Sequence, residues 1–532
     1  MKLLISQNRK GFVLAITAIV MNSVLNILQA SLLGVLFDHL SDIMQPWLLG
    51  MVVLYLVLTM TASLYIDFAK ESLKKNIRGF LLKNGIRAYM NMDELAFEKK
   101  ETSVYINEMT TEVDMVIDQY VTPLLNTFAL ITSFVLGSVY FLFLDWRMLL
   151  FLYAGSLVTL AINRICQARL ARNQQSILET KNEWICTLQS FFSNFSAIKD
   201  FGLEEKETEV LERAGMHNVK AYYKAGIELA NLDSIDLEIG FALFFGLIVL
   251  CGTLFSGTIS AGIAITAVQL TNNIVNPIIN FTTIWNRLNA SKPVLERLLS
   301  MGKDRQEKTA EEIDEVVDTI EVDAPLIQVG DAKLLHDIHL RFEKGGKYMI
   351  TGPSGCGKTT LIRTLKGTIP SACVRLNDRS GKSMKEQLCV IGQKTSLFPC
   401  TLAQNIALNK PIGKKEIERL LARVHLSHLD PDRPVRLDHD TMSGGERQRV
   451  LLARVMAQNR PWIFLDEAFS ALDHETTRLL EREYVTDPAL SVVSICHKPV
   501  LENIQYYDQI IMMEKGTVKK VMTPEEWIHS LS

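Results

Sequence analysis

Two glycine-rich stretches of the sequence have the residue types and the spacing to bind phosphate groups. The first, GPSGCGKTT at residues 352–360, fits the pattern G-x-x-x-x-G-K-[ST]. Glycines let backbone N–H groups approach a phosphate, Lys358 can reach the β- and γ-phosphates of a nucleotide, and the Thr359 hydroxyl can bind Mg²⁺. A plain glycine-rich turn is the alternative, but the apolar strand pattern before the loop and the helical pattern after it favour phosphate binding. The residues expected around the phosphates are Gly352, Pro353, Ser354, Gly355, Cys356, Gly357, Lys358, Thr359 and Thr360.

The second stretch is TMSGGERQRV at residues 441–450. Ser443, Gly444 and Gly445 are small residues that precede a helical pattern starting at Glu446. The N-terminus of a helix is a ready anion site, because its first N–H groups have no partner within the helix. The sequence therefore predicts two phosphate sites in one domain. The second site is expected to bind a different phosphate from the one held by the first glycine loop.

A pair of carboxylates follows an apolar strand pattern, WIFLDEA at residues 462–468. Asp466 is suited to Mg²⁺ coordination, and Glu467 to orienting or deprotonating an attacking water. An apolar strand that ends in Asp-Glu is common and carries little weight alone. Beside the glycine loop, the pair predicts nucleotide hydrolysis.

Composition limits the classes of protein that could carry these motifs. The 532 residues include 56 Lys plus Arg and 59 Asp plus Glu, so the net charge of −3 gives no sign of a nucleic-acid partner. Hydrophobic residues make up 48% of the chain, and their excess lies before residue 290. Eight scattered cysteines without CxxC spacing predict reduced thiols rather than a disulfide framework or a zinc site.

The first half of the chain contains uncharged runs that are long enough to cross a bilayer. The charge-free run 239–286 is too long for one crossing, and it breaks at the turn-like sequence SGTISAG, residues 256–262. The short fourth run continues as a helical pattern past residue 163. Six spans are predicted, at about 11–37, 43–66, 119–144, 148–166, 239–255 and 262–286.

The distribution of Lys and Arg predicts the orientation of these spans. Basic clusters precede the first span and follow the second and fourth, whereas the connections 38–42 and 145–147 are short and poor in basic residues. Because basic loops stay inside, both termini and the ATPase domain are expected in the cytoplasm. The long inside loops, about 67–118 and 164–238, have helical patterns, so we expect helices that continue beyond the membrane.

The predicted fold is therefore multidomain. An all-α six-helix transmembrane domain with long cytosolic helix extensions, residues 1–300, precedes a charged linker, residues 301–318. An α/β P-loop ATPase domain that binds nucleotide is predicted to follow at residues 319–532.

Taken together, the glycine loop, the carboxylate strand and MSGGERQR resemble the ATP-binding-cassette (ABC) transporter family, whose signature usually begins Leu-Ser-Gly-Gly. Further motifs follow in the family's order. Gln393 resembles the glutamine of the Q-loop, Asp473 in SALD that of the D-loop, and His497 the switch histidine. Looser similarity before residue 300 is to exporter-type (type IV) half-transporters, with fused membrane and nucleotide-binding domains.

The resemblance implies the cofactors, the partners and the remaining residue roles. ATP and Mg²⁺ would bind where two nucleotide-binding domains pair head to tail, so that Ser443–Gly445 hold the γ-phosphate of ATP bound to a neighbouring chain. His497 would bond that γ-phosphate in its own chain's site, and Gln393 would contact Mg²⁺ or water. Asp473 would order the dimer interface. The second half-transporter could be an identical or a different chain.

One position departs from the family pattern. An aromatic residue that stacks on adenine usually stands near the position of Val329, which is not aromatic. How adenine is held is therefore left open. Glu467 is present, so the sequence does not predict a degenerate, non-hydrolysing half.

Amide side chains mark the first and last predicted spans, and interhelical hydrogen bonding is the simpler explanation for them. In exporters that this chain resembles, these two spans border the central cavity, so an uncharged, hydrogen-bonding lining would suit a peptide-like or amphipathic cargo. The amides are Asn22, Asn26, Gln29, Gln269, Asn272, Asn273, Asn276 and Asn280.

Three functions are weighed on this basis. ATP-driven export of a peptide-like or amphipathic solute across a bacterial cell membrane is the leading hypothesis. Uptake of a siderophore or another small molecule on the same scaffold is the second. An ATP-gated channel or sensor is the third, and it is disfavoured by the presence of Glu467 and His497.

Overall fold

The computed structural model describes residues 2–40, 44–254, 260–301, 311–329, 332–369, 373–392, 396–436 and 442–531. The chain forms two compact units, each with its own interior. Unit 1 comprises Met1–Asn91 and Lys100–Arg305, and unit 2 comprises Met92–Lys99 and Gln306–Ser532. The short segment Met92–Lys99 thus packs with the second unit, although it lies within one of the inside loops predicted from the sequence.

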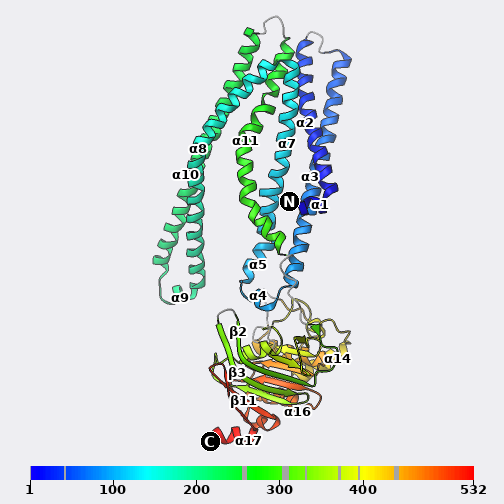
Figure 1. Cartoon of the computed structure of the whole chain (residues 1–532), viewed down its shortest axis with the longest axis vertical. Helices are drawn as coiled ribbons and strands as arrows, with labels where there is room; N and C mark the ends of the chain where they lie inside the picture. The colour runs from blue at the N-terminus through cyan, green and yellow to red at the C-terminus, as the bar shows by residue number, and fades with distance from the viewer. Residues whose placement is uncertain are drawn as a thin grey trace. The chain divides into compact units, whose positions relative to one another are not determined.

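Unit 1 is built of helices. They are α1 (Lys2–Gln7), α2 (Arg9–Asp38), α3 (Pro46–Met90), α5 (Thr102–Met109), α6 (Thr111–Val116), the π-helical turn η2 (Ile117–Val121), α7 (Thr122–Leu144), α8 (Trp146–Ser193), α9 (Phe195–Asp200), α10 (Glu204–Leu254) and α11 (Ala261–Ser300). The predicted helical transmembrane domain is confirmed as an all-helical unit. Long helices α8 and α10 lie side by side and are joined at one end by α9 (Figure 1).

Each of the six predicted spans falls on one of the helices α2, α3, α7, α8, α10 and α11. Among the described residues, four stretches are long and apolar enough to cross a membrane: Arg9–Asp38, Pro46–Met90, Thr102–Leu144 and Glu204–Thr253. Within α8 the apolar part, Trp146–Ile162, is shorter. Crossings by α8 and α11 stay a prediction. A span needs about 20 residues, so α8 with 48 and α10 with 51 residues run well beyond one bilayer thickness.

Close backbone contact joins α2 to α11. A Cβ atom at Gly34 would lie 2.2 Å from Thr266 Oγ1 and 2.7 Å from the carbonyl oxygen of Gly262, so only glycine fits there. Thr266 Oγ1 donates a hydrogen bond to the carbonyl oxygen of Ala30 at 3.1 Å. Small residues allow this approach between helices in a membrane, where packing and hydrogen bonds replace the hydrophobic effect.

The amide side chains of both helices lie outside this contact. Asn22, Asn26 and Gln29 of α2 are exposed within the chain. On α11 the polar residues recur every three or four positions and form an exposed stripe, namely Gln269, Asn272, Asn276 and Asn280. Asn280 Nδ2 donates to the carbonyl oxygen of Asn276 in its own helix at 2.9 Å. These amides are therefore available to a partner or a solute rather than used to hold α2 against α11.

Unit 2 contains α4 (Glu94–Glu98) and two main sheets. Its strands are β1 (Glu311–Glu312), β2 (Thr319–Val329), β3 (Ala332–Glu343), β4 (Lys347–Thr351), β5 (Val374–Leu376), β6 (Arg379–Ser380), β7 (Lys382–Ser383), β8 (Leu388–Ile391), β9 (Trp462–Asp466), β10 (Ser491–Ile495), β11 (Gln509–Glu514) and β12 (Thr517–Met522). Its other helices are α12 (Lys358–Leu365), α13 (Leu402–Ala407), α14 (Lys414–Arg423), α15 (Gly444–Gln458), α16 (His474–Thr486), the 3₁₀ helix η3 (Leu501–Tyr506) and α17 (Pro524–Leu531).

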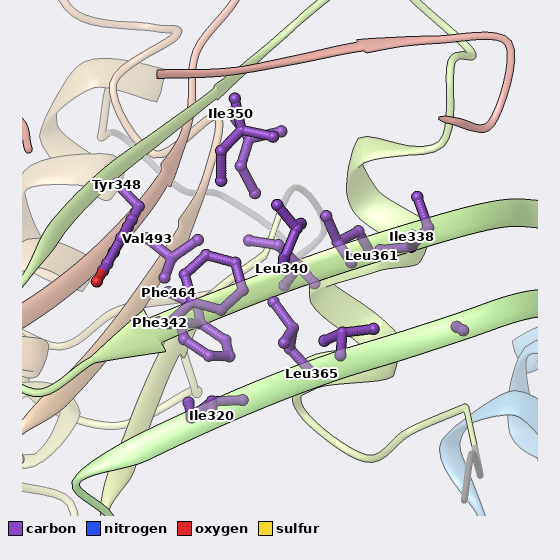
Figure 2. Packing of buried hydrophobic residues seen from close by; sticks show 14 of the residues in the cluster. Ile320, Ile338, Leu340, Phe342, Tyr348, Ile350, Leu361, Leu365, Phe464 and Val493 are labelled. Carbon is purple, nitrogen blue, oxygen red and sulfur yellow. The ribbon is translucent and has the colours of Figure 1, made fainter. Parts of the chain in front are cut away.

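The larger sheet has the strand order β12-β11-β4-β10-β9-β8, in which all neighbours are parallel except β11 and β12. A second, antiparallel sheet has the order β3-β2-β5-β6. Apolar side chains of both sheets and of α12 share one core, in which Phe342 of β3 lies beside Phe464 of β9 (Figure 2). The carboxyl ends of β4, β9 and β10 meet at one edge, where ligands bind in open α/β sheets. The predicted α/β P-loop domain is confirmed.

Candidate nucleotide-binding site

Crowding fixes the glycine loop between β4 and α12. Gly352 has a φ of +147°, and a Cβ atom there would lie 2.2 Å from the carbonyl oxygen of Met513 in β11. Gly357 has a φ of +104°, and its Cβ would lie 2.5 Å from Leu335 Cδ2 of β3. Side chains are therefore excluded at both ends of the loop. Between them, the residues Pro353, Ser354 and Gly355 are exposed, so this part of the loop is open to a phosphate.

Lys358 is held inside this loop and is only 5% exposed. Its Nζ donates hydrogen bonds to the carbonyl oxygens of Gly352 and Pro353, each at 2.9 Å. Cys356 is also buried, with its Sγ 3.9 Å from the same Nζ. The buried thiol packs beneath the loop, so the main chain rather than this side chain faces the phosphates. The ammonium therefore lies against the main chain of the loop.

Asp466 at the end of β9 is a buried carboxylate that lacks enough partners. It is 3% exposed, and the Thr359 hydroxyl donates a hydrogen bond to it. Its Oδ1 atom has no hydrogen-bond partner among the described residues. Burial raises the pKa of Asp466, and the negative charge of neighbouring Glu467 adds to this effect.

An orphaned carboxylate oxygen beside a hydroxyl fits the oxygen preference of Mg²⁺. Within the described part of the chain no three His, Cys, Asp or Glu residues converge on a metal position. Mg²⁺ usually takes one or two protein oxygens and completes its shell with phosphates and water. Thr359 and Asp466 would therefore be the residues that hold it, as the sequence predicted.

Glu467 and His497 are brought together by two parallel strands. Asp466 of β9 pairs in register with Ile495 of β10, so the residues just beyond each strand become neighbours. His497 Nε2 lies 2.8 Å from Glu467 Oε1. The left-handed φ of +56° at Glu467 turns the chain sharply there, and its N–H donates to the Ile495 carbonyl oxygen at 3.3 Å. Such strained positions are typical of functional sites.

The signature stretch forms the N-terminus of α15. Ser443 caps this helix through a capping box: its hydroxyl accepts from the N–H of Glu446 at 3.2 Å, and its own N–H donates to Glu446 Oε2 at 2.8 Å. These hydrogen bonds lower the pKa of Glu446. Gly444 and Gly445 follow without side chains, and a Cβ at Gly445 would lie 3.1 Å from the carbonyl oxygen of Ala471. The remaining N–H groups of this turn can receive an anion.

The D-loop packs directly on the signature helix. Gln448 accepts a hydrogen bond from the N–H of Ala471 at 2.8 Å and donates one to Ser470 Oγ at 3.1 Å. Asp473 ends the D-loop as the cap of α16, where its carboxylate accepts from the N–H of Thr476 at 3.0 Å. Hydrogen bonding to Thr476 lowers the pKa of Asp473.

The two phosphate sites rest on different hydrophobic cores. Leu361 and Leu365 of α12 pack with β2, β3 and β4. Val450 and Leu451 of α15 pack instead with α13 and α14. The glycine loop and the signature helix are therefore held in place by different sets of buried residues.

Two sequence predictions are not addressed by this geometry. Gln393 lies outside the described residues, so its role stays a prediction. Val329 is the last residue of β2, and how this end of the strand holds adenine likewise stays open.

The contacts between α4 and the P-loop helix α12 were not predicted from the sequence. Arg363 donates to both carboxylate oxygens of Glu98 at 2.9 Å, and Lys366 Nζ lies 2.6 Å from Glu94 Oε2. Leu95 packs against the core that carries α12. The acidic residues of DELAFE were the only signal in the sequence, and nothing there indicates their partners. Ion pairs therefore connect segment 92–99 to α12, which begins at Lys358.

Comparison with known proteins agrees with this geometry. The family model described as ABC transporter transmembrane region matches residues 12–278, and the model described as ABC transporter matches residues 335–470. The chain belongs to the ABC transporter family. With a membrane unit and a single cassette in one chain, this ABC transporter is an exporter-type half-transporter, and its cassette is an ATPase coupled to transport.

Relatives and solved structures extend this comparison. An ATP-dependent lipid A-core flippase of Acinetobacter baylyi is 25% identical over 422 residues, which are 75% of this chain and 72% of the relative. Another of that name from Francisella novicida is 25% identical over 471 residues, covering 81% and 76%. A structure titled as a bacterial Atm1-family ABC exporter with ATP bound has a TM-score of 0.78 at 16% identity, over 99% of this chain and 97% of that one.

The unpaired oxygen of Asp466 leads to a prediction about stability. Asp466→Asn keeps the shape but removes a buried charge, so thermal stability without nucleotide should rise at pH 7. Because the pKa of Asp466 is raised in the folded state, its buried charge does not reduce the free energy of unfolding at low pH. The reduction develops as the pH rises above the usual pKa range of Asp. The gain should therefore shrink as pH falls toward 4.

The same variant should lose the stabilisation that MgATP gives the folded protein. In the wild type this stabilisation is about 2.7 kcal/mol when the MgATP concentration is a hundred times Kd. Differential scanning fluorimetry measures both effects. Asp432→Asn is the control, because Asp432 is exposed and paired with Lys414. It should change neither the thermal stability without nucleotide nor the shift caused by MgATP. A full MgATP shift in Asp466→Asn would contradict the assigned role in binding Mg²⁺.

The α4 contacts predict rescue by charge exchange. Glu98→Arg or Arg363→Glu places like charges together, so α4 should detach and chymotrypsin should cleave faster after Phe97. The double variant restores opposite charges, worth about 1 kcal/mol for such partly exposed partners, and should return cleavage toward the wild-type rate. Arg419→Glu, at an exposed position of α14, should leave cleavage unchanged. Fast cleavage in the double variant would show that this ion pair does not hold α4.

Proposed function

We propose that two copies of this chain, or one copy and a related half-transporter, form an ATP-driven exporter of an amphipathic solute in a bacterial cell membrane. Both termini and the cassette would face the cytoplasm, as the basic loops indicate. The observation that carries the proposal is the separation of the two phosphate sites onto different cores. Because the signature helix packs on a different core from the glycine loop of its own chain, it is suited to bind the ATP of a neighbouring cassette.

Each residue of the site then has a task in hydrolysis. Lys358 and the loop N–H groups bind the phosphates, and Thr359 and Asp466 hold Mg²⁺, which when bound offsets the charge of the phosphates. Glu467 orients the attacking water and accepts its proton. His497, 2.8 Å from Glu467 Oε1, keeps that carboxylate in place and can turn to the γ-phosphate. Ser443–Gly445 of the neighbour would complete the site.

Two observations support an amphipathic cargo. The amide stripe of α11, from Gln269 to Asn280, is exposed within the chain and can donate and accept hydrogen bonds. Relatives that match three quarters or more of this chain are named lipid A-core flippases, and a lipid is amphipathic. Both observations favour a molecule with polar and apolar parts, and the first alone would also suit a peptide.

Hydrolysis by Glu467 is tested by Glu467→Gln. The amide keeps the size and the hydrogen bond to His497 but cannot accept a proton, so ATPase activity should fall at least a hundredfold, as expected when a general base is lost. ATP binding should be retained or tightened. Phosphate release and retention of labelled ATP on the purified protein measure the two effects. Turnover at the wild-type rate would remove Glu467 from this role.

The shared site is tested by Ser443→Arg. A long cationic side chain at the cap of α15 should prevent closure of the signature on a neighbour's nucleotide and abolish ATPase activity. Labelling of the glycine loop by a photoreactive ATP analogue should persist, because Lys358 rests on a different core. Loss of this labelling would mean that Ser443 serves the nucleotide site of its own chain. Ser470→Ala, a nearby D-loop change, serves as the matched control for folding and labelling.

A further inference from the structure

A pocket opens in unit 1 where α7, α8 and α11 meet, and we call it the three-helix pocket. Its volume is about 260 Å³, and its walls include Leu130, Phe134, Leu160, Pro277, Phe281 and Ile284. Pro277 stands inside α11 and cannot donate a backbone hydrogen bond, which loosens the helix at this level. Nothing in the ATPase site or in the helix contacts described above uses this pocket.

The chemistry of the walls favours hydrocarbon over water. Thr127 is the polar residue of the lining, and its hydroxyl already donates to the carbonyl oxygen of Pro123 at 2.9 Å. A water molecule in a buried site needs two to four polar partners, and the described lining offers none beyond this committed hydroxyl. A volume of 260 Å³ is much larger than the ~30 Å³ of one water and suits a segment of an alkyl chain.

The pocket lies toward the cytosolic side of the predicted spans. At ~1.5 Å per residue, Pro277 is roughly 24 Å along α11 from Ala261, and the hydrocarbon core is about 30 Å thick. Trp285, which stacks on Phe281 with ring centroids 6.0 Å apart and is 54% exposed, follows two turns later. Tryptophan prefers the membrane–water interface. An alkyl chain from the inner leaflet could therefore enter at this depth.

Two arginines lie one helical turn beyond residues of the pocket wall, on the side predicted to be cytosolic, and we call this edge of the pocket the rim. Arg287 follows Ile284 by one helical turn, and Arg164 follows Leu160 by one turn, so each shares a helix face with a residue of the pocket wall. Both arginines are exposed. Neither forms an ion pair with a carboxylate in the described part of the chain. A guanidinium binds phosphate and carboxylate in a bidentate manner, so the rim is complementary to an anionic headgroup.

We propose that the three-helix pocket binds the alkyl chain of an anionic amphipathic cargo, whose phosphate or carboxylate is held by Arg164 and Arg287. This inference rests on the proposed function and narrows its cargo class. The apolar walls provide affinity for the chain, and the two arginines select the headgroup charge. The amide stripe, which includes Asn276 and Asn280, runs along the same helix and offers hydrogen bonds to the polar part of the cargo.

The first test measures binding of labelled decyl phosphate to the full chain in nanodiscs of zwitterionic lipid. Leu130→Trp fills the pocket and should weaken binding about tenfold, which corresponds to ~1.4 kcal/mol. Leu142→Trp makes the same change on a 59% exposed position of the same helix and should shift the affinity less than twofold. Equal losses in both variants, or no loss in Leu130→Trp, would overturn the assignment of the pocket.

The second test separates headgroup recognition from chain binding. Replacement of Arg164 and Arg287 by Gln should weaken decyl phosphate about tenfold but leave decanol binding unchanged. Arg147→Gln at the opposite end of α8 is the control and should affect neither ligand. Equal weakening of both ligands by the rim variant would mean a structural defect, and unchanged decyl phosphate binding would remove the arginines from the site.

A cargo must be released when the cassettes close, whereas a structural lipid stays bound. In Glu467→Gln loaded with MgATP, decyl phosphate affinity should fall at least tenfold relative to the nucleotide-free protein, because one state must bind cargo more tightly than the other. An unchanged affinity would identify a structural lipid site and contradict the proposal. If the Glu467→Gln variant retains ATP without hydrolysing it but the protein never binds decyl phosphate, the three-helix pocket is not a cargo site. The proposed ATP-driven function would then be unaffected.

Discussion

The rest of the site depends on a buried carboxylate, Asp466, whose Oδ1 atom has no hydrogen-bond partner among the residues that the structure describes. Asp466 is placed at the edge of the sheet by β9, whose five residues are all buried, and its side chain accepts a hydrogen bond from the Thr359 hydroxyl. A buried charge without full compensation costs stability, and a bound Mg²⁺ would remove that cost. If MgATP binds here as proposed, it would complete the structure of the folded cassette and so link nucleotide binding to the stability of the domain.

Helix α12 connects this chemistry to the rest of the chain. Lys358 at its first turn is held by the glycine loop, while Arg363 and Lys366 near its end hold Glu98 and Glu94 of α4. A small displacement of the loop on binding or hydrolysis would move both ends of this two-turn helix together. Along the chain, α4 lies between α3 and α5.

Much of this could be predicted from the sequence because the motifs are local. The glycine loop, the cap at Ser443 and the carboxylates after β9 depend on residues close together in the chain, and the order of motifs indicated the family. Contacts between distant segments could not be predicted in this way. The Glu98–Arg363 pair joins residues far apart in sequence, and the three-helix pocket arises only from how α7, α8 and α11 pack. The six-span prediction rested on charge-free runs and on the placement of Lys and Arg. Among the described residues, α11 does not have the hydropathy of the four long apolar stretches, and its amide stripe lowers that hydropathy.

The central claim is that each ATP is bound between two chains, and mixing two inactive variants tests it most directly. Lys358→Ala disables the glycine loop and Ser443→Arg disables the signature, so each variant alone should lack ATPase activity. When they are co-expressed with different affinity tags and the mixed dimer is purified through both, one shared site contains an intact glycine loop and an intact signature. ATPase activity should therefore return in this mixed dimer. A doubly tagged dimer that stays as inactive as its parents would contradict the shared site.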